Sequence, residues 1–129
     1  MSSRRQDVPI PLWWRYSNRF PAEAFVSVVT VGEIVKGIEV LPDGRKKQEL
    51  RVWLDSLEQH YSGQILPVDE ETARIWGEVS ASAQTQGRIL LAVDGLIAAT
   101  ALQHGLVVMT RNIDDFAASG VRRLNPWST

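Results

Sequence analysis

The stretch DGLIAATALQHGLVVM, residues 94–109, decides the fold class. Its first part, Asp94 to Leu102, is apolar on nearly every side of a helix, and His104-Gly105 is the usual glycine stop. Leu106 to Met109 is a short apolar run that predicts a strand in the middle of a sheet. A buried helix leading into a buried strand is typical of an α/β fold, in which helices cover a mainly parallel sheet.

The same alternation of strand and helix continues on both sides of this stretch. Apolar and β-branched runs predict further strands at residues 25–29, 65–68 and 121–124. Residues repeating at intervals of three and four predict helices after the first two of these strands, including an amphipathic helix over residues 44–61. After residue 109 we expect a polar turn with a short helix. The order favours a parallel sheet.

Three helix starts can be predicted from capping residues. Thr30 and Glu33 have the spacing of a capping box, and Asp43 precedes the amphipathic helix as a candidate cap. Asp69 precedes the next helix, whose first turn is acidic. The basic run at residues 45–47 is expected to face solvent.

Composition limits the domain count and the class of protein. The chain has 129 residues, which fits a single domain over residues 1–129. The 14 basic and 15 acidic side chains give a formal net charge of -1, so any contact with nucleic acid must be local. The chain has no cysteine, which excludes disulfides and thiolate metal ligands and suits a cytoplasmic protein. We expect no membrane span and no secretory signal.

Carboxylates fall where the chain leaves a predicted strand or enters a helix. These are Glu33, Asp94, Asp114 and Asp115. If the sheet is parallel they gather at one edge, where carboxylates repel each other unless Mg²⁺ or Mn²⁺ neutralises them. A metal-activated water beside a phosphate is the basis of phosphodiester hydrolysis. Each acid also has a simpler explanation. Glu33 could be half of its capping box, and Asp94 could cap its helix and complement the helix dipole. Asp114 and Asp115 could be solvated loop residues or cap the short helix after them.

The ordered motifs of this sequence resemble the PIN-domain toxins of bacterial toxin–antitoxin pairs, the VapC and FitB-like group. The resembling segments are SVVTVGE with KG (residues 27–37), ILPVD with WG (65–77), DGLIAATA (94–101), TRNIDDF (110–116) and LNPW (124–127). The resemblance implies a three-layer PIN-like fold with a mainly parallel sheet flanked by helices.

The resemblance also implies a site and a function. Glu33, Asp94 and Asp115 would be the catalytic, metal-holding acids, and Asn112 stands where relatives carry an acid or an amide. Thr110 and Arg111 would contact the substrate. Such proteins are Mg²⁺- or Mn²⁺-dependent endoribonucleases, usually homodimers, that a cognate VapB-like antitoxin neutralises.

The N-terminal segment, residues 1–20, departs from the family pattern. Relatives open with an apolar strand that ends in an aspartate, whereas here only Asp7 is acidic and Pro9 and Pro11 follow it closely. In the PIN fold that strand lies in the middle of the sheet, so the sheet is expected to have a gap. Either the start of this sequence lies downstream of the natural one, or the N-terminal segment, a partner chain or direct pairing of the flanking strands closes the gap.

Two other functions remain open from the sequence. The chain could be a catalytically inactive, truncated PIN domain that keeps antitoxin binding or self-association. It could also be a phosphoacceptor receiver domain, which gathers acids at a similar edge. A receiver needs a lysine after its last strand, and the strand at 121–124 has only arginines beside it.

Overall fold

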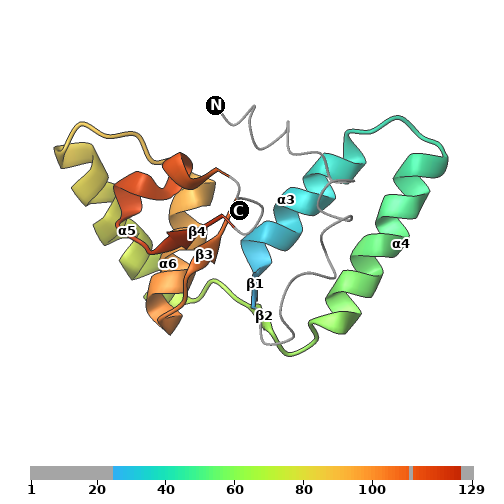
Figure 1. Ribbon diagram of the computed structural model, residues 1–129, viewed down its shortest axis with the longest axis horizontal. Helices are drawn as coiled ribbons and strands as arrows, with labels where there is room; N and C mark the ends of the chain where they lie inside the picture. Colours follow the sequence, from blue (N-terminus) through green and yellow to red (C-terminus); the bar gives the residue numbers. More distant parts are fainter. Residues whose placement is uncertain (1–24, 111, 126–129) are drawn as a thin grey trace. The chain divides into compact units, whose positions relative to one another are not determined.

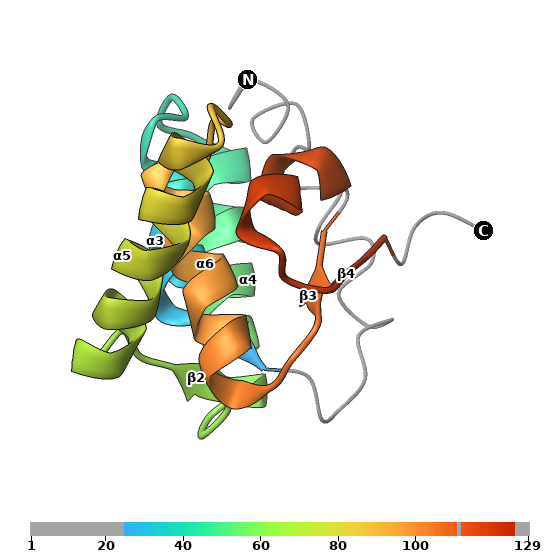
Figure 2. The ribbon, with the colours of Figure 1, turned by 90° about the vertical axis from the view of Figure 1, so that its left-hand side faces the viewer.

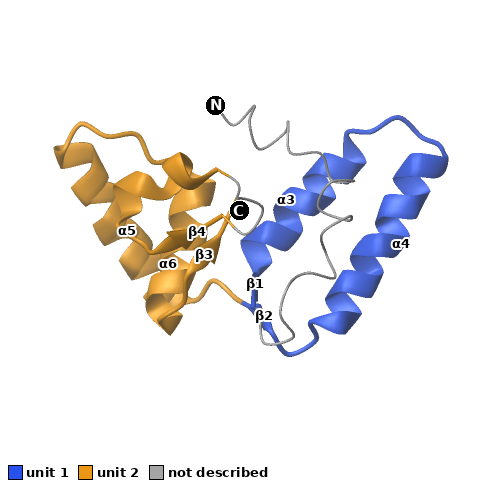
Figure 3. Cartoon of the chain, viewed as in Figure 1, with its two compact units in different colours: residues 1–66 blue, residues 67–129 orange. Residues whose placement is uncertain are grey.

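A computed structural model of the chain describes residues 25–110 and 112–125. It consists of two compact units, residues 1–66 and residues 67–129 (Figure 3). The expectation of one domain over residues 1–129 stays a prediction. Arg111, Asp7 and the rest of residues 1–24 lie outside the described residues, and so does the predicted role of Arg111.

The first unit contains two helices and two short strands. In chain order they are β1 (Val26–Ser27), α3 (Val28–Glu39), α4 (Arg45–His60) and β2 (Ile65–Leu66) (Figure 1). Helix α3 begins earlier than predicted, because Ser27 is its N-cap and the Ser27 side chain accepts a hydrogen bond of 3.0 Å from the Val29 amide. The predicted capping box of Thr30 and Glu33 is therefore wrong.

The helices of the first unit pack through an apolar core. It is formed by Ile34, Ile38, Leu50, Trp53 and Leu54. Helix α4 matches the predicted amphipathic helix. Its N-cap is Gly44 and not Asp43, and no side chain caps the helix through a hydrogen bond. Lys47 is only 7% exposed, so the prediction that the whole basic run faces solvent is wrong at this residue.

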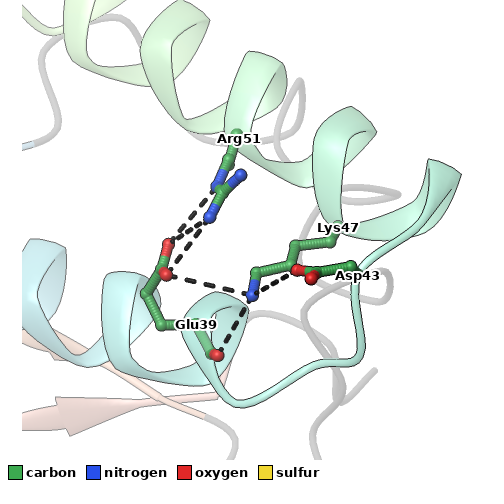
Figure 4. A network of polar contacts seen from close by, with 4 residues as sticks. All are labelled: Glu39, Asp43, Lys47 and Arg51. Atoms are coloured by element: carbon green, nitrogen blue, oxygen red, sulfur yellow. Dashed lines mark hydrogen bonds and ion pairs between the residues drawn. The ribbon is translucent and has the colours of Figure 1, made fainter.

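A polar network explains why Lys47 leaves the solvent. Lys47 Nζ donates to the carbonyl oxygen of Glu39 at 3.3 Å and to Asp43 Oδ1 at 3.4 Å (Figure 4). Arg51 adds hydrogen bonds of 3.1 to 3.3 Å to the Glu39 carboxylate. The basic face of α4 therefore binds the C-terminal end of α3, where a cation also complements the helix dipole.

The second unit contains three helices and two short strands. They are α5 (Glu70–Thr85), α6 (Ala92–His104), β3 (Val108–Met109), the 3₁₀ helix η2 (Ile113–Ser119) and β4 (Arg123–Leu124). Helices α5 and α6 lie side by side, and η2 packs against both (Figure 2). The core between α6, β3 and η2 is formed by Ala98, Ala101, Val108, Phe116 and Val121.

Two predicted helix boundaries in this unit are confirmed. Asp69 caps α5 in a capping box with Thr72, in which the Thr72 amide donates to Asp69 Oδ1 at 3.0 Å. Gly105 ends α6 with φ of 67°, a left-handed conformation that glycine adopts without strain.

The strands form two separate parallel pairs. Val26 and Ser27 pair with Ile65 and Leu66, and Val108 and Met109 pair with Arg123 and Leu124. The parallel arrangement confirms the predicted sheet type, although each strand is shorter than predicted. The ways in which the expected gap could close stay predictions, because β1 belongs to the first unit and β3 to the second.

Within the part of the chain that the structure describes, no helix is both long enough and apolar enough to span a membrane.

Candidate functional site

Asp94 is the most buried of the predicted site acids. It is the third residue of α6 and only 1% exposed, in a helix otherwise formed mainly by apolar residues. The N-cap of α6 is Leu91, so Asp94 does not cap the helix through its side chain. A carboxylate in the first turn complements the helix dipole, but burial removes it from water and needs compensation.

Gly95, the residue after Asp94, allows a tryptophan of α5 to pack against α6. A Cβ atom at Gly95 would lie 2.9 Å from Cδ1 and 3.1 Å from Nε1 of Trp76. The buried indole nitrogen of Trp76 donates no hydrogen bond to any described residue. A glycine inside a helical run is itself a signal of close packing, so a role for Gly95 could have been predicted from the sequence.

Polar residues follow the end of β3. The Asn112 amide donates to Thr110 Oγ1 at 3.0 Å, and the Asp115 amide donates to the Asn112 carbonyl at 3.0 Å. These bonds fix a tight turn that leads into η2. The N-cap of η2 is Asn112, without a side-chain cap, so neither Asp114 nor Asp115 caps this helix.

Two of these acids differ in exposure. Asp114 is exposed, whereas Asp115 is half-buried and its Oδ2 atom is fully buried. Asp115 precedes Phe116, which lies in the core between α6 and β3. Elements α6 and η2 pack together, so Asp94 and Asp115 lie on neighbouring elements of one unit.

Glu33 belongs to the other compact unit. It lies on α3, half-buried, next to the core residue Ile34. Because α3 begins at Val28, Glu33 is the sixth residue of the helix and has no part in its cap. The capping explanations for Glu33, Asp94 and Asp115 are therefore wrong, but Asp94 does lie in the first turn of α6, where an acid complements the helix dipole.

The donor atoms of these residues suit a hard divalent cation. Glu33, Asp94 and Asp115 offer carboxylate oxygens and Asn112 offers an amide oxygen, which are ligand types that Mg²⁺ and Mn²⁺ accept. Across residues 25–110 and 112–125, no group of three or more acidic, histidine or cysteine side chains lies close enough to hold a metal ion. The chemistry of the donor set fits the metal, and Asp94 and Asp115 lie in one unit while Glu33 lies in the other.

Parallel strand pairs and helices define an α/β class of protein, and acidic residues lie near its strand ends and helix starts. A family model of the PIN domain matches residues 12–120, which span both compact units. The chain therefore belongs to the PIN domain family.

The chain is similar to proteins that are named as a toxin and as a ribonuclease. It is 41% identical to Toxin FitB of Neisseria gonorrhoeae over 106 residues, which cover 81% of this chain and 76% of the relative. It is 34% identical to VapC ribonuclease Y4jK of Sinorhizobium fredii over 104 residues, which cover 80% of this chain and 74% of the relative. The predicted resemblance to the VapC and FitB-like group is confirmed.

Solved structures agree with this assignment. The crystal structure of FitAcB from Neisseria gonorrhoeae matches with a TM-score of 0.81 and 38% identity, covering 89% of this chain and 84% of that chain. VapBC-5 of Mycobacterium tuberculosis, a member of the VapBC family of toxin–antitoxin systems, matches with a TM-score of 0.61 and 27% identity, covering 78% and 81%. The predicted PIN-like fold is confirmed.

Proposed function

We propose that this chain is the toxin of a toxin–antitoxin pair and hydrolyses RNA phosphodiester bonds with the help of Mg²⁺ or Mn²⁺. The observation that carries the proposal is the burial of Asp94 at the start of α6, where its side chain does not cap the helix. A similar relative is called a ribonuclease, and two similar solved structures contain FitB-type and VapBC proteins.

Each predicted site residue has a role in this reaction. Glu33, Asp94 and Asp115 hold the cation through carboxylate oxygens, and Asn112 adds an amide oxygen. Thr110, fixed by its bond from the Asn112 amide, and Arg111 bind the RNA backbone. A bound cation would polarise the phosphodiester and lower the pKa of an attacking water.

Asp94 and Asp115 also shape the approach of the substrate. Both are acidic and lie in one unit, so they repel an RNA phosphate until a cation offsets their charge. RNA binding and cation binding should therefore favour each other, since each is stronger when the other is present.

An RNA cleavage assay tests the proposal. The full chain is incubated with end-labelled single-stranded RNA in Mn²⁺ or in excess EDTA, beside Asp94→Asn and the exposed helix residue variant Asp55→Asn. We expect the wild type to cleave the RNA in Mn²⁺ but not in EDTA, and Asp55→Asn to leave the cleavage rate unchanged. Asp94→Asn should lower the rate at least about 100-fold, because replacing even an outer-shell partner of a metal lowers metal affinity or activity roughly 10- to 100-fold.

Two results would contradict the proposal. Cleavage that persists in EDTA, or in the Asp94→Asn variant, would show that the reaction does not depend on a metal ion held by Asp94. A chain that binds the antitoxin encoded beside it but never cuts RNA would favour the inactive PIN domain instead. Where cleavage occurs, the same antitoxin should suppress it.

A further inference from the structure

The loop between α5 and α6, residues 87–91, has a defined conformation. It leaves α5 through Gly87, whose φ of 68° is left-handed and whose amide donates to the Gln84 carbonyl at 3.0 Å. The Arg88 amide donates to the Ala83 carbonyl at 2.9 Å. These bonds satisfy carbonyl groups at the end of α5 and fix the backbone position of residue 88.

The other end of this loop is held against the start of α6. The Gly95 amide donates to the Leu91 carbonyl at 2.8 Å, and Leu90 Cδ2 lies 3.5 Å from the position of a Cβ atom on Gly95. Gly95 is the neighbour of Asp94. The loop is therefore anchored at both ends, and its second anchor is the helical turn that carries the buried acid.

The middle of the loop presents a cation and an apolar side chain to solvent. Ile89 is 86% exposed, more than any other large apolar side chain in the described part of the molecule. Arg88 is exposed and forms no ion pair with a described residue, in contrast to Arg74, which pairs with Glu70 at 3.0 Å. The loop therefore presents a cation, unpaired among the described residues, and an apolar side chain at consecutive positions in solvent.

We propose that Arg88 and Ile89 form a contact site for the single-stranded RNA substrate. Arg88 binds a backbone phosphate, and Ile89 packs against the face of an unstacked base. Charge favours RNA as the occupant, because a polyanion must approach the acids Asp94 and Asp115 and the chain has no net positive charge to attract it. Arg88 is the basic residue nearest to Asp94 in the sequence. This inference rests on the proposed ribonuclease function.

Binding to labelled single-stranded RNA tests the site. Fluorescence anisotropy in the Asp94→Asn background, where cleavage is suppressed, gives the Kd and its dependence on salt for Arg88→Ala and Ile89→Ser. We expect Arg88→Ala to raise the Kd about 10-fold and to lower the salt slope by roughly 0.7, the value of one phosphate contact on a single strand. Ile89→Ser should raise the Kd about 3-fold or more without changing the slope.

Matched variants in the other unit provide the controls. Arg45→Ala removes an exposed arginine of α4, and Val40→Ser removes an apolar side chain that is 75% exposed. Both should leave the Kd within about 2-fold of the parent value. With Asp94 intact, Arg88→Ala should raise the KM for RNA cleavage and leave kcat unchanged, as expected for lost substrate binding.

The outcomes separate this inference from the function on which it rests. If Asp94→Asn abolishes cleavage while Arg88→Ala and Ile89→Ser match their controls, the loop has no contact with RNA and the ribonuclease stands. If the same two variants instead lose antitoxin binding only, the loop is a protein contact and the inference is wrong. If the wild-type chain neither binds nor cuts RNA, both proposals are wrong.

Discussion

Lys47 Nζ lies 3.3 Å from the backbone carbonyl oxygen of Glu39, so the first turn of α4 binds the C-terminal end of α3 (Figure 4). The carboxylates of Glu39 and Asp43 lie 3.9 and 3.4 Å from the same nitrogen. One buried ammonium group thus offsets a helix dipole and two acids where the chain turns from α3 into α4.

Replacing Lys47 should destabilise the first unit modestly. We expect Lys47→Met to lower the free energy of unfolding by about 1 kcal/mol, because methionine keeps much of the aliphatic packing but neither donates to Glu39 nor complements the dipole. Urea unfolding measures this, with Lys46→Met as the exposed control, which should change stability by less than about 0.5 kcal/mol. Equal effects of the two variants would show that the contact contributes nothing specific.

The second prediction concerns Thr72, which is fully buried. Its hydroxyl lies 2.9 Å from Asp69 Oδ1, also contacts Gln103 Oε1 of α6, and accepts a bond of 3.1 Å from the Asp69 amide. Thr72→Val keeps the shape but removes the hydroxyl, so we expect a loss of about 1 to 3 kcal/mol in the free energy of unfolding. The exposed Thr85→Val is the matched control, and a loss no larger than in that control would contradict the prediction.

Much of the helical structure can be predicted from the sequence, as the boundaries at Asp69 and Gly105 show. Asp69 precedes an acidic first turn, and Gly105 follows a long apolar run, so local chemistry alone sets both boundaries. The start of α3 could not be predicted in this way. Ser27 and Thr30 are both capping residues, and β1 ends at Ser27 because its pairing with β2 covers only two residues.

The candidate site could be predicted in part, where its features depend on residues that are close in the sequence. The burial of Asp94 follows from the apolar helix around it, and the turn after β3 follows from polar residues in sequence. The burial of Lys47 depends on where the α3–α4 turn places Glu39 and Asp43. The packing of Trp76 against Gly95 depends on the approach of two helices. Contacts between distant residues leave little trace in the periodicity of one chain.

The third prediction concerns the response to acid. Hydrogen bonds from the backbone and side chain of Thr72 hold the pKa of Asp69 below its ordinary value of 3.8. A lowered pKa in the folded state stabilises the protein above pH 3.8, and this contribution is lost as pH falls through the folded pKa. Asp69→Ala should therefore reduce stability at neutral pH and flatten its decline between about pH 5 and pH 3. Thermal melts across this range measure it, and a decline as steep as that of the wild type would contradict it.

The fourth prediction concerns Tyr61, which follows α4. Its hydroxyl is buried, donates no hydrogen bond to a described residue, and has a raised pKa because burial disfavours the charged form. Tyr61→Phe removes a polar group with no bond to lose and keeps the ring that meets His60 edge-on. We expect stability to stay equal or to rise by up to about 1 kcal/mol. A loss above about 1 kcal/mol in urea unfolding would reveal a partner for the hydroxyl.

The central proposal is that Asp94 and Asp115, which lie on the packed elements α6 and η2 of the second unit, hold the same divalent cation. Calorimetric titration of Mn²⁺ into the wild type, Asp115→Asn, Asp94→Asn and the double variant tests it most directly, with Asp55→Asn as the control. We predict one Mn²⁺ site, weakened at least about 10-fold by each single change. The double variant should lose little more than the weaker-binding single variant, because both changes disrupt one site. Wild-type affinity in Asp115→Asn, or losses that simply multiply in the double variant, would contradict the proposal.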